Sequence, residues 1–352
     1  MTWMVYGANG FTGTLVAELA VERGLRPVLA GRSAEKVRPL AERLGLEHRV
    51  FGLEDAVDAL RDIDAVAHCA GPFSATSGPM VDACLKAKTH YVDITGEIDV
   101  FEAVSRRDRE AEDAGVVLLP GAGFDVVPTD CIAAMLHAAL PTATHLDLAF
   151  LVQGGASAGT AQTAVEGSGG GGRARVDGEI RSVRLGHRRR TAHFRDRPRD
   201  VGAIPWGDVS TAYRSTGIPN ITTFTTFPGV LGTLQPLAAP LLRTGLVRRL
   251  GKAVAQRIGG PNDATRARTR CEVFGEAWDG QGNRFRAALT GPNAYDLTAD
   301  SVVKAVQRLD DVTPGAHTPS SAFGADYVRA LDGVVVSDPT PAAGPPSAGG
   351  QQ

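Results

Sequence analysis

The sequence predicts an α/β protein, in which a doubly wound parallel sheet of the Rossmann type is joined to a second, α+β substrate domain. Three observations lead to this prediction: strand-length apolar runs alternate with helical stretches, a glycine-rich turn follows the first run, and the alternation stops near residue 125. Strands that alternate with helices form a parallel sheet with right-handed crossovers. At 352 residues, 43% of them hydrophobic, the chain is long enough for two cores.

The elements of the first domain follow in order along the chain. Apolar runs of strand length lie at 2–6, 26–30, 48–51, 64–69, 90–94 and 115–120. Stretches with helical periodicity lie between most of them, at 12–23, 34–44, 54–61, 78–87 and 98–114. We therefore expect a dinucleotide-binding domain over residues 1–125 and an α+β substrate and catalytic domain over residues 126–311. Residues 337–352, rich in Pro, Gly and Ala, are expected to form a disordered tail.

The glycine-rich turn has the pattern of a dinucleotide cradle. In "VYGANGFTG", Gly7, Gly10 and Gly13 follow the first predicted strand and open the first predicted helix. Such glycines allow a tight turn, close approach of the backbone to a pyrophosphate, and close packing of the helix on the strand. The helix N-terminus then offers unpaired N–H groups to the phosphates. The expected cofactor contacts in this turn are Gly7, Asn9, Gly10, Phe11, Thr12 and Gly13.

The end of the second predicted strand indicates which dinucleotide is bound. Domains selective for NAD usually carry an acidic residue there, which binds the ribose 2′-hydroxyl. This chain instead reads "LAGRSAEK", with Arg32 and Ser33 at that place. Because a guanidinium pairs well with phosphate oxygens, these residues suit the 2′-phosphate of NADPH. The alternative is that Arg32 is an ordinary solvated loop residue.

The glycine spacing G-x-x-G-x-x-G is also tolerated by short-chain dehydrogenases, which need a Tyr-x-x-x-Lys pair for proton transfer. None of the five tyrosines of this chain is followed by a lysine four positions on. The sequence therefore argues against that mechanism.

Composition narrows the classes of function further. A formal net charge of -2 gives no overall attraction to nucleic acid or to an anionic membrane. The four cysteines have no C-x-x-C spacing, which argues against a disulfide framework or a zinc site. The first residues show no basic region leading into a long apolar stretch, so we expect a cytoplasmic protein.

Several motifs in series resemble those of a known family. "GANGFTG" and "AGRS" are followed by "HCAGPF" at 68–73, "HYVDITGE" at 90–97 and "GAGFDVVPTD" at 121–130. In this order they resemble the saccharopine dehydrogenase-like NADP-binding oxidoreductases, and the resemblance covers essentially the whole chain. Downstream segments within 159–172, 204–221 and 294–324 look like the branch that contains mycobacterial-type trans-acting enoyl reductases. The resemblance implies that residues 312–336 fold back and complete the first domain.

The motifs that follow the fourth and fifth predicted strands supply further cofactor contacts. Open α/β sheets bind ligands at this carboxyl edge, and the resemblance places the second motif near the nicotinamide half of the cofactor. Alternatives remain, because Gly-Pro can be a simple turn and Thr95 or Asp93 can cap a helix. Asp125 likewise has two possible roles: its side chain faces the cofactor cleft, or it caps the helix that Pro128 opens. The expected contacts are Cys69, Ala70, Gly71, Pro72 and Phe73, together with Thr95, Gly96 and Glu97.

Two stretches bear on the substrate and partners. Residues 181–200 carry eight arginines and two histidines against two aspartates, and this segment from Arg181 to Arg199 could dock an acyl carrier protein or the phosphates of a CoA-type thioester. Solvated arginines on an exposed strand are the alternative. Residues 215–242 contain no charged side chain, which suits an acyl groove, the interface of a homodimer or a membrane-surface contact. The glycines at 167–172 suit a mobile hairpin tip or a lid.

The expected function is NADPH-dependent reduction of the C=C bond of an α,β-unsaturated acyl thioester. Hydride addition at the β-carbon leaves an enolate-like thioester, which needs hydrogen-bond donors at its oxygen and a proton at its α-carbon. In "WGDVSTAYRSTG" the candidate donor is Tyr213, oriented by Asp208, although a core phenol and a turn residue are equally compatible with the sequence. Two other functions stay open: saccharopine-type reduction of an imine formed from an amine and a 2-oxo acid, and a non-catalytic NADPH-binding scaffold.

Overall fold

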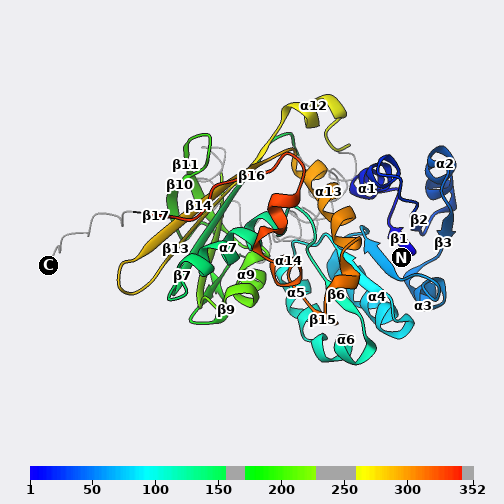
Figure 1. Ribbon diagram of the computed structural model, residues 1–352, viewed down its shortest axis with the longest axis horizontal. Coiled ribbons are helices and arrows are strands. Elements are labelled where there is room, and N and C mark those ends of the chain that lie inside the picture. The colour runs from blue at the N-terminus through cyan, green and yellow to red at the C-terminus, as the bar shows by residue number, and fades with distance from the viewer. Residues whose placement is uncertain (156–170, 227–258, 343–352) are drawn as a thin grey trace.

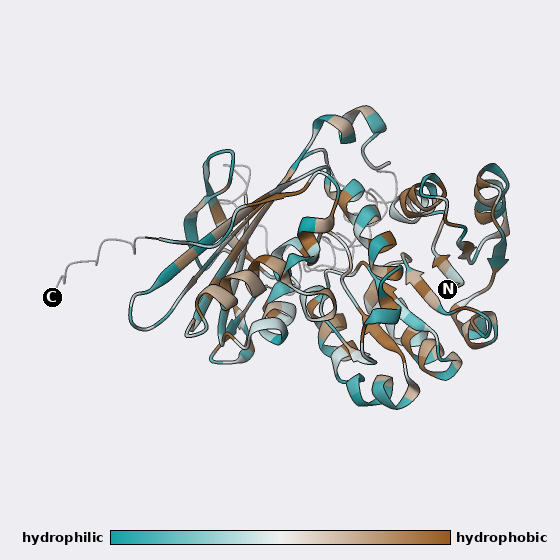
Figure 2. Ribbon diagram, viewed as in Figure 1, coloured by the Kyte–Doolittle hydropathy of each residue, from teal (hydrophilic) through white to brown (hydrophobic). Residues whose placement is uncertain are grey.

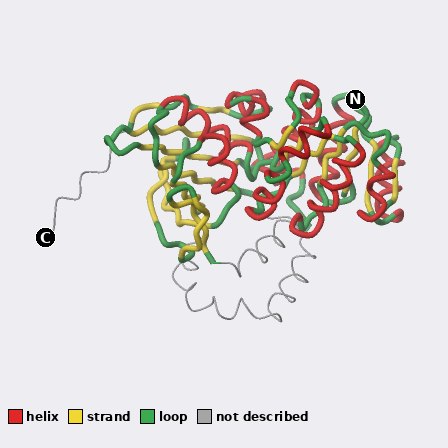
Figure 3. The backbone as a smooth tube through the Cα atoms, turned by 90° about the horizontal axis from the view of Figure 1, so that it is seen from below, coloured by secondary structure: helices red, strands yellow, loops and turns green. Residues whose placement is uncertain are grey.

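The computed structural model describes residues 1–155, 171–226 and 259–342. Two sheets lie at opposite ends of the molecule with helices between them, as Figures 1 and 3 show. The first sheet is built from six strands of the N-terminal third of the chain and one short strand near the C-terminal end of the described residues, and the second is built from the remainder. No helix within these described ranges combines the length and apolar character needed to cross a bilayer.

The first sheet is parallel and doubly wound. Its strand order is β15-β6-β5-β4-β1-β2-β3, and every neighbouring pair is parallel. The strands are β1 (Trp3–Tyr6), β2 (Val28–Gly31), β3 (His48–Val50), β4 (Ala65–His68), β5 (His90–Asp93), β6 (Val117–Leu119) and β15 (Gly315–Ala316). The order reverses between β1 and β4, which is the switch point where such sheets bind ligands. The predicted fold class is confirmed.

Helices cover both faces of this sheet. They are α1 (Phe11–Glu22), α2 (Ala34–Leu44), α3 (Ala56–Ala59) after the short 3-10 helix η1 (Leu53–Asp55), α4 (Phe73–Ala87), α5 (Ile98–Ser105) and α6 (Asp108–Ala114). In Figure 2 the strands are largely brown, whereas the helices carry teal on their outer turns. Apart from the exposed Val50 on the edge strand β3, the apolar residues of strands β1 to β6 are buried in the core of the domain.

Two helices differ from the prediction. The helix expected over 98–114 is broken into α5 and α6, which meet near Arg106. Helix α4 begins at Phe73, five residues before the expected start at 78, because the Glu97 carboxylate accepts hydrogen bonds from the backbone N–H groups of Phe73 and Ser74, both at 2.9 Å. A cap supplied from a distant loop leaves no local sequence pattern.

The second sheet is mixed. Its main path is β10-β11-β12-β7-β13-β14-β16, in which β12 and β7 are parallel and the other neighbours are antiparallel. The strands on it are β10 (Arg189–His193), β11 (Pro198–Ile204), β12 (Asn220–Thr225), β7 (His145–Val152), β13 (Cys271–Trp278), β14 (Arg284–Gly291) and β16 (Val335–Val336). Strand β8 (Gly172–Val176) pairs with β12 and β9 (Glu179–Val183), and β17 (Thr340–Pro341) pairs with β14.

Helices fill the space between the two sheets. Helix α7 (Val127–Ala139) packs on β13 so closely that a Cβ added to Gly275 would lie 2.4 Å from a methyl carbon of Ile132. Helix α13 (Ala294–Val306) packs against α1. The remaining helices are α9 (Asp208–Thr216), α12 (Asp263–Arg268), η2 (Leu309–Asp311), α14 (Pro319–Phe323) and η3 (Ala325–Ala330). One continuous core therefore runs from the first sheet through these helices to the second.

The C-terminal part of the described chain joins both sheets. Strand β15 lies within residues 312–336 and extends the first sheet beside β6, whereas β16 and β17 extend the second sheet beside β14. Ser337 accepts a hydrogen bond from the N–H of Ala288 at 2.8 Å. Residues 337–342, which we expected to begin a disordered tail, are thus paired with a strand, and residues 343–352 lie outside the described residues.

Two arginines of the arginine-rich segment form ion pairs with other strands of the second sheet. Arg188 and Arg190 both bind the carboxylate of Asp147 on β7, with nitrogen-oxygen distances of 2.7–2.8 Å. Arg190 also pairs with Glu276 on β13, which accepts a further bond from Arg284. Because β11 and β12 lie between β10 and β7 in the sheet, these contacts require the β10–β11 hairpin to curl over the sheet face. A small apolar core lies under this hairpin.

Ion pairs to other described residues hold four arginines of this segment, namely Arg181, Arg188, Arg190 and Arg199. Arg188 and Arg190 pair with carboxylates on β7 and β13, which the sequence does not place beside this segment, whereas Arg181 and Arg199 pair with the nearby Glu179 and Asp196. Exposed arginines without an ion pair to a described residue remain at 184, 195 and 197.

Candidate functional site

The glycine turn lies at the carboxyl end of β1 and touches the turn after β4. Gly7 has a φ of +82°, and a Cβ placed on it would lie 2.8 Å from the Cβ of Ala70. The N–H of Gly10 donates to the carbonyl of Gly7 at 2.9 Å, which closes the turn. A Cβ on Gly13 would lie only 2.4 Å from that same carbonyl oxygen. A side chain on Gly7 or Gly13 would therefore overlap neighbouring atoms of the turn.

The N-terminus of α1 is open to a ligand. Its N-cap residue Gly10 supplies no side-chain hydrogen bond, and no acidic residue lies in its first turn, where Thr12 is partly exposed. Phe11 turns away from this end, since its ring packs edge-on against Tyr295 at 4.9 Å between centroids. An uncapped helix N-terminus beside a glycine turn binds phosphate oxygens. The N-terminus of α4 differs, because Glu97 occupies it.

The end of β2 fits a 2′-phosphate. Arg32 is exposed and makes no ion pair with any residue that the structure describes. Ser33 is the N-cap residue of α2, yet its side chain makes no capping hydrogen bond. Asn9 completes this corner, because its side-chain oxygen would lie 3.1 Å from a Cβ on Gly31 at the end of β2. Two polar side chains are thus left available beside the glycine turn.

Replacing Arg32 with aspartate is expected to weaken NADPH binding by about 10- to 100-fold, the worth of a hydrogen bond to a charged group. NADH, which lacks the 2′-phosphate, should bind relatively better. Fluorescence titration with both nucleotides measures the change. Arg38→Asp, at an exposed position further along α2, makes the same charge change and should leave the preference intact. An unchanged preference in Arg32→Asp would mean that other residues hold the 2′-phosphate.

The turn after β4 is joined to the glycine turn. The N–H of Cys69 donates to the carbonyl of Tyr6 at 2.8 Å, and Ala70 packs on Gly7. Gly71 and Pro72 then lead into α4, so the predicted residues from Cys69 to Phe73 lie at the same carboxyl edge as the first turn. Burial raises the pKa of the Cys69 thiol to about 12, which keeps it neutral.

The loop after β5 is braced by Asp93. Its carboxylate accepts hydrogen bonds from the N–H of Thr95 at 2.9 Å, the N–H of Gly121 at 2.8 Å and the hydroxyl of Tyr91 at 2.6 Å. The hydroxyl of Thr95 in turn accepts from the N–H of Glu97 at 3.1 Å. Neither Asp93 nor Thr95 caps α5, so the capping alternative is not observed. The brace fixes the loop that contains Gly96.

The carboxylate of Glu97 caps α4, as described above. The resemblance placed this residue near the nicotinamide half of the cofactor. The structure shows that Glu97 holds two loops of the carboxyl edge together, because it links the β5 loop to the start of α4.

Gly96 marks the place where the two domains meet, which we call the domain junction and define by Gly96, Asp125, Trp206, Gly207 and Asp208. A Cβ on Gly96 would lie 3.0 Å from Oδ2 of Asp125, and a Cβ on Gly207 would lie 3.2 Å from the carbonyl oxygen of Gly96. The indole N–H of Trp206 donates to the backbone carbonyl of Asp125 at 2.8 Å. The start of α9 is thereby fixed against the carboxyl edge of the first sheet.

Burial raises the pKa of Asp125 to about 7, although its side chain keeps some exposure. No side chain caps α7, so the capping alternative for this residue is not observed either. Asp208 is fully buried, and neither of its carboxylate oxygens has a hydrogen-bond partner among the described residues. Burial raises its pKa well above the ordinary value, an effect that the Thr129 hydroxyl partly opposes and the charges of Asp130 and Asp125 increase.

The structure separates Asp208 from Tyr213. The two residues are five positions apart on α9, which turns their side chains by about 140° from one another. The Tyr213 ring lies under the guanidinium of Arg175 at 4.0 Å, and its hydroxyl faces Gly178 in the β8–β9 turn. Asp208 therefore does not orient Tyr213, because a helix period of 3.6 residues places positions five apart on different faces.

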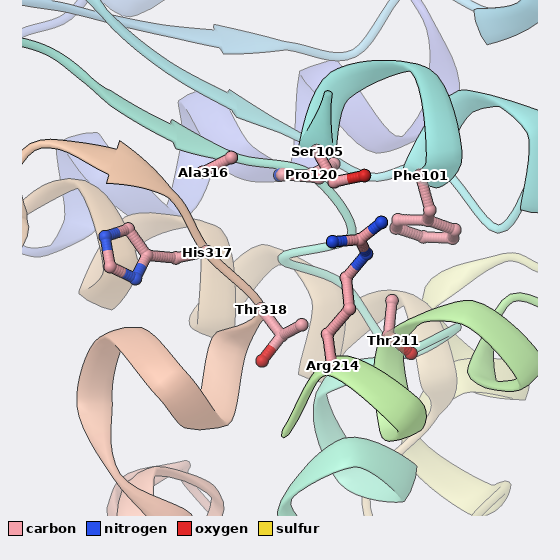
Figure 4. A pocket seen from close by; sticks show the side chains of 8 residues that line it. All are labelled: Phe101, Ser105, Pro120, Thr211, Arg214, Ala316, His317 and Thr318. Atoms are coloured by element: carbon pink, nitrogen blue, oxygen red, sulfur yellow. The ribbon is translucent and has the colours of Figure 1, made fainter. Parts of the chain in front are cut away.

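The sequence analysis did not predict the roles of Trp206, which binds Asp125, and of Gly207, which packs against Gly96. The one available signal was a tryptophan beside a glycine just before a helix. The structure also contains a small pocket beside the junction, between α5, α9 and the β15–α14 turn. Figure 4 shows Arg214 reaching from α9 toward Phe101, with His317 pointing away. The pocket is lined by Phe101, Ser105, Pro120, Thr211, Arg214, Ala316, His317 and Thr318, none of which is a predicted contact.

These features define a class of protein: an α/β dinucleotide-binding domain whose cofactor edge faces a second domain. Comparison with known proteins identifies the domain. Residues 3–119 match the family model described as "Saccharopine dehydrogenase NADP binding domain". Over these residues the chain is similar to the NADP-binding domain of saccharopine dehydrogenases, so the predicted resemblance and the predicted cofactor are confirmed for this domain. The residues present fit NADPH. The glycine turn has no room for a side chain at Gly7 or Gly13, so its backbone stays bare, and Arg32 is exposed and makes no ion pair with a described residue, so it can bind the 2′-phosphate.

Individual relatives extend the comparison. A trans-acting enoyl reductase of Mycobacterium tuberculosis is 35% identical over 139 residues, which are 36% of this chain and 33% of the relative. The enzyme of the same name from Mycobacterium ulcerans is 31% identical over 139 residues. The chain thus matches about a third of the length of these curated relatives. Apo saccharopine dehydrogenase (L-Glu forming) from Saccharomyces cerevisiae shares the fold, with a TM-score of 0.59 over 96% of this chain and 99% of that one at 12% identity.

Proposed function

We propose that the protein is an NADPH-dependent enoyl reductase that acts on an α,β-unsaturated acyl thioester. The observation that carries the proposal is the 31–35% identity to proteins named trans-acting enoyl reductases. The site geometry is compatible with it, because the cofactor edge of the first sheet faces a junction with a carboxyl group of raised pKa. The missing Tyr-x-x-x-Lys pair also argues for a proton source outside the short-chain dehydrogenase pattern.

In this proposal each part of the chain has a separate task. The glycine turn and the N-terminus of α1 hold the pyrophosphate of NADPH, and Arg32 with Ser33 holds the 2′-phosphate. NADPH supplies the hydride when it is bound. The Asp93 brace keeps the β5 loop in place, and the start of α9 closes the other side of the junction. Tyr213 has no part in the proposed proton transfer, because it lies at the β8–β9 turn.

The proposal for partners is narrower than the sequence suggested. A carrier protein that delivers the thioester would meet the exposed arginines at 184, 195 and 197, since the other arginines discussed above are used within the sheet. The described part of the charge-free stretch contains β12, a central strand between β11 and β7. Residues 227–242 of that stretch, and residues 167–170 of the glycine run, lie outside the described residues. A homodimer remains part of the proposal.

Saccharopine-type imine reduction is the second candidate. It is favoured by the fold shared with the yeast enzyme over almost the whole of both chains, although the low identity shows the fold alone. A 2-oxo acid substrate would need cationic groups for its carboxylates. Arg214 lines the small pocket described above and is a candidate for this role, and its guanidinium lies 3.7 Å from the carboxylate of Glu102.

Turnover of NADPH with matched substrates tests the proposal. Loss of NADPH absorbance is followed with long-chain trans-2-enoyl thioesters in one series and with a 2-oxo acid plus an amine in the other. We expect turnover with the thioesters and stereospecific use of one hydride. Turnover only in the second series would replace the proposal with imine reduction. If NADPH binds tightly but is not consumed with either free or carrier-bound substrates, the result would favour the non-catalytic scaffold.

A further inference from the structure

Enoyl reduction needs a proton at the α-carbon, and the domain junction contains one acid that is placed to give it. Asp125 follows the loop after β6, at the carboxyl edge of the first sheet, and its Oδ2 lies against Gly96 of the β5 loop. The side chain keeps some exposure, so that a ligand can reach it. Its backbone carbonyl is fixed by the indole of Trp206, which holds the residue in position.

The other acidic side chains near this edge either accept hydrogen bonds within the protein or are too buried to contact a substrate. Asp93 accepts three hydrogen bonds and is 1% exposed. Glu97 caps α4. Asp130 binds the hydroxyl of Ser215 and the N–H of Ser320, and it is fully buried. Asp208 is also without exposure, so a substrate cannot touch it.

The buried state of Asp208 is a second, independent observation. Both of its oxygens are without hydrogen-bond partners among the described residues, and a fully buried carboxylate in that state would be costly to ionise. Burial raises the pKa of Asp208 well above its ordinary value and so favours its neutral form. Burial in the junction likewise favours the protonated form of Asp125.

We propose that Asp125 is the residue that protonates the α-carbon of the reduced thioester. The inference rests on the proposed function. In this step the O–H bond of the Asp125 carboxyl breaks and a C–H bond forms at the α-carbon. The electron pair for that bond comes from the former C=C bond, after the β-carbon has accepted the hydride that NADPH supplies. Asp125 is left as a carboxylate, and a proton from water restores it.

The proposed role makes the pH dependence specific. The acid must be protonated to act, so kcat should fall as the pH rises above about 7, where burial places the pKa of Asp125. The titratable group whose charge interacts with it is Asp208 at the start of α9, which in turn interacts with Asp130 on α7. Burial raises the pKa of Asp93 to about 6, so that its titration lies close to that of Asp125 and must be assigned by substitution.

A titration of the protein without substrate tests the assignment first. NMR of protein with isotope-labelled aspartate should show one carboxyl resonance with a midpoint near pH 7. It should disappear in Asp125→Asn and persist in Asp208→Asn and in Asp113→Asn, the last at an exposed position on α6. Persistence of the resonance in Asp125→Asn would overturn the inference, because another group would then hold that proton.

Kinetics of the holoenzyme complete the test. Asp125→Asn should lower kcat at least about 100-fold, as loss of a general acid does, and should remove the decline of kcat above pH 7. The affinity for NADPH should stay within about twofold of the wild-type value, since Asp125 is not among the groups expected to bind phosphate. Wild-type turnover in Asp125→Asn would overturn the inference while leaving enoyl reduction intact. A wild-type enzyme inactive with every thioester would instead refute the proposed function, and the inference with it.

Discussion

Replacing Gly13 with alanine is expected to lower the free energy of unfolding by about 2 kcal/mol and to weaken NADPH binding at least about tenfold. An alanine inside a helix normally stabilises it by up to about 1 kcal/mol over glycine. Here the added Cβ would lie 2.4 Å from the carbonyl oxygen of Gly7 and 3.0 Å from the Cα of Ala8. Both are backbone atoms, so α1 must move away from β1 and carry its N-terminus with it.

Gly78→Ala provides the matched control. Gly78 lies inside α4, and a Cβ there would meet nothing within 4 Å. This variant should be neutral or slightly more stable, and its NADPH affinity should be unchanged. Thermal unfolding and NADPH fluorescence titration of both variants measure the effects. Equal behaviour of the two variants would show that the loop relaxes without cost, and that the close packing of α1 on β1 does not position the phosphates.

The second large effect is expected from Asp147→Ala, which should lower the free energy of unfolding by about 2–4 kcal/mol. Asp147 is 2% exposed in its side chain and accepts three charge-assisted hydrogen bonds from Arg188 and Arg190. Loss of one partner of a buried ion pair typically costs about 3–5 kcal/mol. Arg188 and Arg190 keep 40% and 19% exposure and can be resolvated, so the expected cost lies toward the lower end.

Chemical denaturation of Asp147→Ala and Asp326→Ala tests this expectation. Asp326 pairs with Arg329 at the surface, at 2.9 Å and with 85% exposure of its side chain, and its loss should cost less than about 1 kcal/mol. If Asp147→Ala is no more destabilised than Asp326→Ala, the arginines do not hold the curled hairpin. The positive segment would then be free for a partner, as the sequence alone suggested.

The first sheet could be predicted almost completely from the sequence because its signals are local. Buried parallel strands are short apolar runs, and the helices between them are periodic, so all six predicted strands from β1 to β6 are present. What was not predicted depends on distant groups. Glu97 extends α4 by capping it from another loop, and β17 forms because β14 offers an edge to residues that look like a disordered tail.

The site divides in the same way. The glycine turn and Arg32 lie within one local unit of strand, turn and helix, so their proximity follows from the fold. The junction depends on packing between the two domains, and its residues lie far apart in the chain. Trp206 and Asp125, which are joined by a hydrogen bond, are 81 positions apart. Tyr213 and Asp208 come from a segment dense in polar residues, and their spacing of five positions places them on different faces of α9. Polar density along a sequence therefore does not show which side chains of a helix lie together.

The C-terminal segment has a consequence for how the protein unfolds. Within about 25 residues the chain places β15 at one edge of the first sheet and β17 against β14 of the second, so a single short length of backbone fastens both sheets. Detaching this segment would expose the edge strand β6 of the first sheet and the edge of β14 in the second sheet. The two halves should therefore melt in one cooperative transition, and a protease cut between β15 and β16 should loosen both at once, although it lies far from the glycine turn.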